Sequence, residues 1–273
     1  MFDLRIVLTL DVLAALKRSL SHALKSVKSS HRVEALARGL SFKTNAAMRI
    51  ALGDSNAMSC LVSGAKFAEY LAQHHFDVSP KNLYLVCAEA AIRQVMQSYP
   101  KLTMHGIGTG PVRSHPDGIQ EALRLDRTRF NESRKRLSEP EAAEQFLLAL
   151  AMLKKMQPTR TIRPGTNSYR LKHIAENCPR TYPEGDDLGP NYVSNGVLIA
   201  AAIHAGFKFQ VYIDEYGYDD IRVNFNMSKR VVDNLDCEVC PDGAKAQGRE
   251  RRKERKIYKL AGVPGISASG TFG

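Results

Sequence analysis

The sequence lacks any apolar run that approaches the roughly 18 residues of a membrane-spanning helix. Its N-terminal stretch is apolar, but Asp3, Arg5 and Asp11 interrupt it where a signal peptide would need an uncharged core. Neither a membrane span nor a secretory leader is therefore predicted. We expect a soluble, cytoplasmic protein.

Cysteine is also scarce, and the five cysteines are odd in number and irregularly spaced, which predicts no disulfide framework. Cys60 and Cys87 lie in apolar stretches that we interpret as helical, where they would be small buried hydrophobes. Cys237 and Cys240 form a single C-x-x-C, whereas a structural zinc site needs four ligands. Cys178 and a histidine would have to complete it, so the pair is interpreted as a surface turn, with zinc left open. No cofactor or metal is predicted.

The composition, 44% apolar and 25% charged, is typical of a folded globular protein. The apolar spacing predicts a mostly helical α+β fold: a helical N-terminal half, then a small unit of helices and an antiparallel hairpin, then a basic tail. The predicted divisions are a small helical module at 1–54, a helical region at 55–160, an α+β unit at 161–236 and a basic, partly disordered tail at 237–273.

In the first module, leucines at helical spacing from Leu13 to Val27 predict an amphipathic helix with a basic opposite face. Ser29 or Ser30 can cap a second helix that stops at Gly39, and Thr44 can cap a third. Two short helices joined by a tight turn fit either an ordinary helical hairpin or a DNA-reading helix-turn-helix.

In the α+β unit, Ser194 can cap a helix over 194–205 that is apolar nearly all round and therefore buried. Apolar and polar residues then alternate over 207–214 and 221–227, which predicts an antiparallel hairpin. We expect its apolar face to pack on the 194–205 helix. The other face would present Lys208 and Arg222 to solvent or ligand.

The net charge of +11 is concentrated in three segments. Residues 17–43 contain seven Lys/Arg against one Glu, and residues 245–259 contain eight against two Glu. Residues 124–136 contain six against one Asp and one Glu. Such clusters attract polyanions because each neutralised phosphate releases condensed counterions. The predicted nucleic-acid contacts, besides Lys172, Lys208 and Arg222, are Arg124, Arg127, Arg129, Arg134, Lys135, Arg136, Arg249, Arg251, Arg252, Lys253, Arg255 and Lys256.

A polar quartet marks the start of the α+β unit. At about 100° per residue, Tyr169, Lys172, His173 and Glu176 fall on one arc of a helix, opposite an apolar arc. His173 and Glu176 could act as acid and base in a metal-independent ribonuclease, with Tyr169 assisting and Lys172 holding phosphate. The alternative interpretation is an ordinary half-exposed helix face.

Two segments resemble proteins of bacterial plasmids, integrative elements and phages. SSHRVEALARGLSFKTNAAMRIAL resembles a short helical module of such proteins, and SYRLKHIAEN…YVSNGVLIAAAIHAGF…NFN resembles the C-terminal half of others. The resemblance implies a bacterial mobile element and carries no established activity.

The segment from Leu171 to Ile174 is also similar to a helix found in barnase, colicin and RelE-like toxin ribonucleases. Those proteins usually follow with a second histidine on this helix, whereas the nearby positions of the present chain are Glu176, Asn177 and Cys178. Three classes of function therefore stay open: a non-enzymatic protein that binds nucleic acid or a ribonucleoprotein, a toxin-like ribonuclease, and a modulator of a protein complex.

Overall fold

A computed structural model describes residues 2–108, 110–111, 115–213 and 219–260. Within them the chain is α+β and 56% helical, with 11 helices and three two-stranded antiparallel sheets. The predicted fold class is confirmed. None of the described helices is both long and apolar enough to cross a bilayer.

The N-terminal part consists of four short helices and one small sheet. Its elements are β1 (Arg5–Leu8), α1 (Leu10–Ala23), α2 (Ser29–Gly39), α3 (Asn45–Ser55), β2 (Met58–Leu61) and α4 (Gly64–Ala72). Thr44 caps α3 as predicted, since its Oγ1 accepts a hydrogen bond from Ala47 N at 3.0 Å. Lys28, not a serine, is the N-cap of α2, which begins at Ser29. The two helices of the expected hairpin are present, and DNA reading by α3 stays a prediction.

The sheet of β1 and β2 is not predicted from the sequence. Ile6 and Leu8 point into the core while Arg5 and Val7 face outward, the alternation of a half-buried strand. Four residues are too few to separate this alternation from a helical period. As a result Cys60, expected on a helix, lies in β2, although it is buried as expected.

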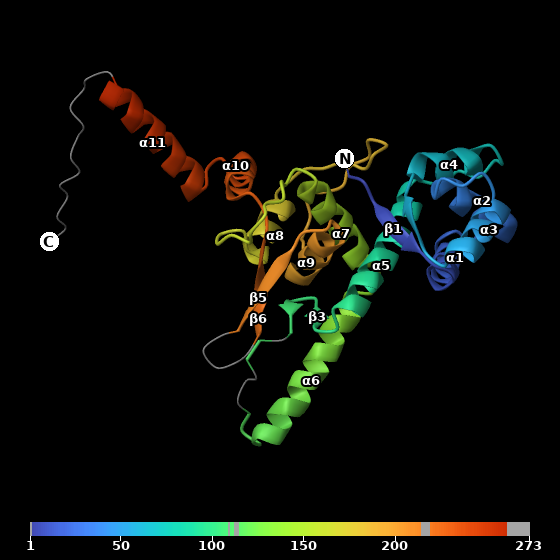
Figure 1. Ribbon diagram of the computed structural model, residues 1–273, viewed down its shortest axis with the longest axis horizontal. Helices are drawn as coiled ribbons and strands as arrows, with labels where there is room; N and C mark the ends of the chain where they lie inside the picture. Colours follow the sequence, from blue (N-terminus) through green and yellow to red (C-terminus); the bar gives the residue numbers. More distant parts are fainter. Residues whose placement is uncertain (1, 109, 112–114, 214–218, 261–273) are drawn as a thin grey trace.

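The middle of the chain forms two long packed helices and a projecting one. Its elements are α5 (Lys81–Ser98), β3 (Leu102–Thr103), β4 (Gly106–Ile107), α6 (Ile119–Arg136) and α7 (Pro140–Leu153). Helix α5 packs against α7, and α6 extends away from the body beyond the end of α5 (Figure 1). The tight β3–β4 turn lies at the base of α6.

The C-terminal part begins with α8 (Ser168–Glu176), α9 (Asn195–His204), β5 (Phe209–Ile213) and β6 (Asp219–Phe225). The predicted hairpin is present, with Phe209 opposite Phe225 and Val211 opposite Val223. Val223 and Phe225 are buried, but a bulge after Val211 leaves Ile213 69% exposed. The apolar face of the hairpin was expected to pack on α9. Strand β6 packs instead on α8 and β4, because α5 and α7 already flank α9.

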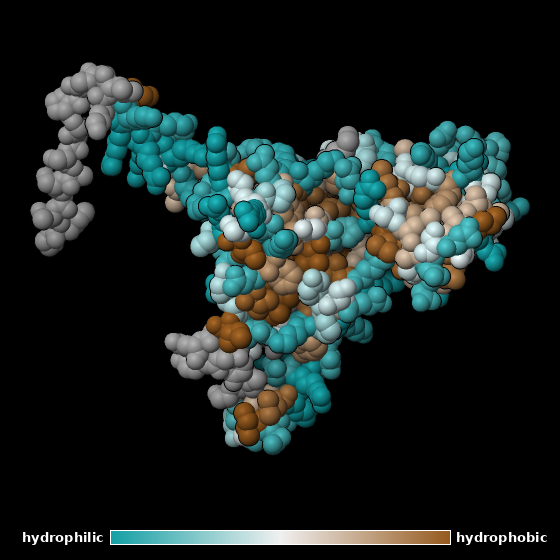
Figure 2. All heavy atoms as spheres, viewed as in Figure 1, coloured by the Kyte–Doolittle hydropathy of each residue, from teal (hydrophilic) through white to brown (hydrophobic). Residues whose placement is uncertain are grey.

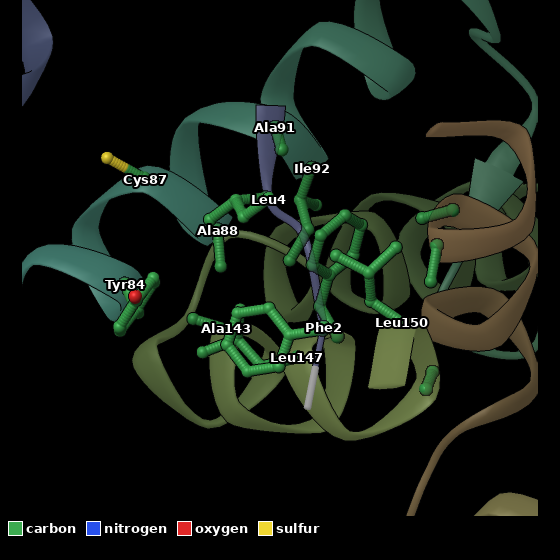
Figure 3. Close-up of a cluster of buried hydrophobic side chains, with 14 of the residues drawn as sticks. Phe2, Leu4, Tyr84, Cys87, Ala88, Ala91, Ile92, Ala143, Leu147 and Leu150 are labelled. Carbon is green, nitrogen blue, oxygen red and sulfur yellow. The ribbon is translucent and has the colours of Figure 1, made fainter. Parts of the chain in front are cut away.

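One hydrophobic core joins the segments that the sequence suggested as separate modules. The N-terminal Phe2 lies edge-on to Tyr84 of α5 at 5.2 Å and to Tyr182 at 6.0 Å. Figure 3 shows Phe2 and Leu4 between α5 and α7, in one buried cluster with Ala88, Ile92, Ala143, Leu147 and Leu150. Helix α9 of the predicted 161–236 unit shares this core and contacts both α5 and α7, and the division into units stays a prediction.

The expected basic tail is largely helical. Helix α10 (Lys229–Val239) carries Cys237, Cys240 caps it, and α11 (Ala244–Leu260) contains the basic run. Helix α11 contacts α10 and otherwise extends from the body, hydrophilic along most of its visible length except for a hydrophobic patch at its far end (Figures 1 and 2). The expectation of disorder at 262–273 lies outside the described residues.

The start of α9 provides a test of this packing. A Cβ on Gly196 would collide with the carbonyl oxygen of Thr103, which is backbone and cannot move aside alone. We expect Gly196→Ala to lower the free energy of unfolding by about 2 kcal/mol or more. Gly53→Ala is the matched control, because nothing lies within 4 Å of its Cβ and α3 gains helix propensity. Urea denaturation of both variants checks this, and equal stability would contradict the close approach.

Candidate nucleic-acid interface

A cleft of about 680 Å³ lies where α6, α8 and the start of α9 meet the β3–β4 turn and β6. Its lining brings together the basic helix and two residues of the polar quartet, Tyr169 and Lys172, which are more than 30 residues apart from that helix in the sequence. The lining residues are Met104, His105, Pro111, Asp126, Arg129, Glu132, Ser133, Arg136, Tyr169, Lys172, Tyr192, Asn195 and Ile221.

Backbone hydrogen bonds fix the floor of the cleft. Met104 N donates to Ser133 Oγ of α6 at 3.1 Å, and Gly196 N of α9 donates to Met104 O at 3.0 Å. The β3–β4 turn is thereby tied to both helices. Gly106, at φ +139°, allows the same turn to approach the Ile221 carbonyl of β6, where a Cβ would collide.

Asn195 joins this floor to β6. Its Nδ2 donates to His105 O at 2.8 Å and to Ile221 O at 2.9 Å. Both partners are carbonyls, which can only accept, so the orientation of the amide is determined. The buried Oδ1 has no hydrogen-bond partner within the described residues.

Two arginines of α6 provide the uncommitted positive charge of the cleft. Neither Arg129 nor Arg136 forms an ion pair or side-chain hydrogen bond with any part of the chain that the structure describes, and both are exposed. By contrast, Arg124 is held by Glu121 at 2.7 and 2.6 Å, and this hydrogen bonding lowers the pKa of Glu121. Arg127 and Lys135 are exposed on α6 but do not line the cleft.

Two arginines of the basic clusters serve as helix caps. Arg134 donates to the carbonyls of Met96 at 2.7 Å, Pro100 at 2.8 Å and Leu102 at 2.9 Å, at the C-terminal end of α5. Arg32 does the same for α1, through the carbonyls of residues 24 and 27. A cation at a helix C-terminus satisfies carbonyls that lack intrahelical partners. We therefore leave Arg134, a predicted phosphate contact, out of the interface.

Lys172 is the buried cation of the quartet, only 7% exposed. Its ammonium lies over two tyrosine rings, 5.3 Å from the centroid of Tyr169 and 4.9 Å from that of Tyr192. Glu176 holds it from the other direction at 3.0 Å. The two rings are themselves about half exposed, at 50% and 58%.

Glu176 is an acceptor for three donors. Besides Lys172 Nζ, it pairs with His173 Nδ1 at 2.7 Å and accepts from Val193 N at 3.3 Å. The last bond fixes the loop that carries Tyr192. His173 is half exposed, and its ring packs edge-to-face with the Tyr169 ring, with 4.7 Å between the ring centroids. Neither His173 nor Glu176 lines the cleft, so the suggested acid and base are not part of its lining.

The remaining predicted contacts lie elsewhere. Arg222 points to Asp220, which holds its guanidinium at 3.1 and 3.0 Å, and it does not line the cleft. The same hydrogen bonds lower the pKa of Asp220 against the opposing effect of burial. Lys208 is exposed just before β5. The other predicted cations are on α11, namely Arg249, Arg251, Arg252, Lys253, Arg255 and Lys256.

Sequence reasoning found Tyr169 but missed three other residues of the cleft lining, Tyr192, His105 and Asn195. Tyr192 precedes a predicted helix cap without any periodic pattern, and His105 lies in a glycine-rich turn. Asn195 is the first residue of α9, directly after the Ser194 cap, and no local pattern marks it as part of a site. Only the cap at Ser194, whose Oγ accepts from Val197 N at 3.3 Å, was available as a signal.

Comparison with known protein families, curated proteins and solved structures found no match to this chain. The resemblances to mobile-element proteins and to toxin ribonucleases therefore stay predictions. Within the described residues, no group of three or more His, Cys, Asp or Glu side chains is arranged to hold a metal ion. Cys237 and Cys240, both half-buried free thiols, thus have no further ligands there.

Glu176 and His173, which are paired with each other on α8, should respond differently to substitution. Glu176→Ala leaves the buried Lys172 ammonium without its counter-charge, and we expect a loss of about 3 kcal/mol in unfolding free energy. His173→Ala replaces an exposed side chain by the best helix former, so its effect should stay within about 0.5 kcal/mol. Thermal and urea denaturation measure both. A His173→Ala protein as unstable as Glu176→Ala would contradict this division.

Proposed function

We propose that this protein is a non-enzymatic binder of nucleic acid, alone or within a ribonucleoprotein, and that α6 and the cleft beside it form the principal contact. The mobile-element setting suggested by the sequence is part of this proposal. The observation that carries it is the convergence of Arg129 and Arg136 with Lys172 and two exposed tyrosines on one cleft. Guanidinium groups bind phosphate through paired hydrogen bonds, and aromatic rings stack on bases.

The charge of α6 supports contact with a polyanion. Its cluster projects away from the protein body, so a long ligand can approach without meeting other elements (Figure 1). Arg127, Arg129, Lys135 and Arg136 are exposed there, and their guanidinium and ammonium groups make no hydrogen bond or ion pair with the described residues. These groups can neutralise phosphates of a nucleic acid and so release the counterions condensed on it.

Helix α11 supports a second, less specific contact. Its 17 residues extend about 25 Å at 1.5 Å per residue, and they carry the whole basic cluster at 245–259. Lys245 pairs with Asp236 of α10 at 3.2 Å, while the contacts of Arg249 with Asn234 and of Lys253 with Glu250 involve only exposed side chains. Because the main contact of α11 within the described residues is with α10, its remaining charges can follow a phosphate backbone that reaches beyond the cleft.

Salt dependence tests the assignment to the cleft. We expect Arg129→Ala/Arg136→Ala to lower the slope of log K against log salt by about 1.4 on single-stranded RNA or DNA, at about 0.7 per phosphate. Arg160→Ala/Arg230→Ala is the matched control: it removes the same charge from exposed positions outside the cleft and should leave the slope nearly unchanged. Fluorescence anisotropy with labelled 20-nucleotide strands measures both.

Equal slopes for the two double variants would place the contact elsewhere on the protein. Deleting residues 244–273 should lower the slope by several units if α11 contributes. No binding of RNA or DNA at low salt would reject the proposed function and leave the protein-complex modulator, which co-purification of a defined protein partner would then support.

One observation favours a ribonuclease as the second candidate. The 2.7 Å hydrogen bond between Glu176 and His173 Nδ1 orients the half-exposed imidazole, and Nε2 makes no hydrogen bond with the described residues, as in a carboxylate-oriented general base. If this dyad is catalytic, RNA cleavage by the wild-type protein should fall at least 100-fold in His173→Ala while the protein remains folded. Absence of cleavage by the wild-type protein under single-turnover conditions would remove this candidate.

A further inference from the structure

We propose that the cleft is a subsite for one unpaired nucleotide of a single strand, with Tyr192 as the stacking surface for its base. The inference rests on the proposed function and makes it specific, because it selects single-stranded over duplex nucleic acid. Three properties of the lining carry it: mixed charge, exposed aromatic rings and size.

The charge of the lining does not suit a phosphate backbone alone. Arg129 and Arg136 are accompanied by the carboxylate of Glu132 on the same helix. Glu132 is exposed and forms no ion pair with any residue described in the structure. A run of phosphates laid along this wall would meet repulsion from this carboxylate. An unpaired nucleotide presents one phosphate for arginine and base N–H donors for a carboxylate.

The aromatic rings supply a face for the base. The Lys172 ammonium lies over the Tyr192 ring at 4.9 Å, and 58% of this tyrosine remains exposed. The Glu176–Val193 hydrogen bond and Lys172 fix the tyrosine's position, so little side-chain freedom is lost when a base stacks on it. Tyr169 is more occupied, since Lys172 and the His173 ring both contact it.

The size of the cleft matches one small unit. Its volume of about 680 Å³ is in the range of sites that enclose a single small molecule, roughly 300–1,000 Å³. Within a duplex each base is covered on both faces by its neighbours, and it offers no free face to a tyrosine unless it leaves the stack. Unpaired bases meet no such barrier, and they are the usual partners of aromatic side chains.

The experiment uses the full chain and a 12-nucleotide single strand that carries one central 2-aminopurine, compared with the blunt duplex of the same sequence. Quenching of 2-aminopurine fluorescence reports stacking, and anisotropy of an end label reports affinity. The variants are Tyr192→Ala, Tyr192→Phe, which keeps the ring, and Tyr212→Ala. Tyr212 on β5 is a comparable control because it is 40% exposed and does not line the cleft.

We expect the single strand to bind at least 10-fold more tightly than the duplex and its 2-aminopurine to be quenched. Tyr192→Ala should weaken single-strand binding about 10-fold and abolish the quenching, whereas Tyr192→Phe and Tyr212→Ala should preserve both. A melting temperature close to wild type, expected for an exposed residue, shows that the loss is local.

Equal affinity for the single strand and the duplex, or quenching of 2-aminopurine that persists in Tyr192→Ala, would overturn the subsite while leaving nucleic-acid binding in place. Failure of the wild-type protein to bind either probe at low salt would overturn the subsite together with the proposed function.

Discussion

The close approach of α9 to the β3–β4 turn determines how the rest of this structure fits together. Gly196 admits the Thr103 carbonyl, and its own N–H bonds to Met104. Helix α9 is buried in the core, where α5 and α7 pack against it. The same turn is bound by Ser133, which places the base of α6 beside the start of α9. The floor of the cleft and the position of the basic helix thus follow from one contact.

The charges of the chain divide into those that build the fold and those that remain available. Arg134 and Arg32 donate hydrogen bonds to backbone carbonyls at the C-terminal ends of α5 and α1, where carbonyls lack intrahelical donors. Arg170 is similarly held by Asp233 and Asp236 at 2.7 and 2.6 Å, which ties α8 to α10. Arg129 and Arg136 have no such partner among the residues that the structure describes. The distinction depends on what surrounds each guanidinium, because their side chains are chemically identical.

The quartet of α8 has a structural and a binding side. Glu176 neutralises Lys172 and holds the loop before α9, so its carboxylate is largely committed. That commitment positions Tyr169 and Tyr192 at the wall of the cleft, where their rings remain exposed. A buried ion pair adds little net stability but costs much when broken. We interpret it here as the device that keeps two aromatic rings in place for a ligand.

The sequence by itself determined the local elements and their faces: the caps at Thr44 and Ser194, the helix of Tyr169 and Glu176, and the hairpin of Val211 and Val223. These follow from periodicity and capping, which act over a few residues. The cleft was decided only by tertiary structure. It joins Arg129, Tyr192 and Asn195, whose association depends on packing between elements distant in the chain. The pairing of β1 with β2 also depends on tertiary structure. So does the role of Arg134, because a local sequence pattern does not show which carbonyl groups of a neighbouring element will lie within reach of a side chain.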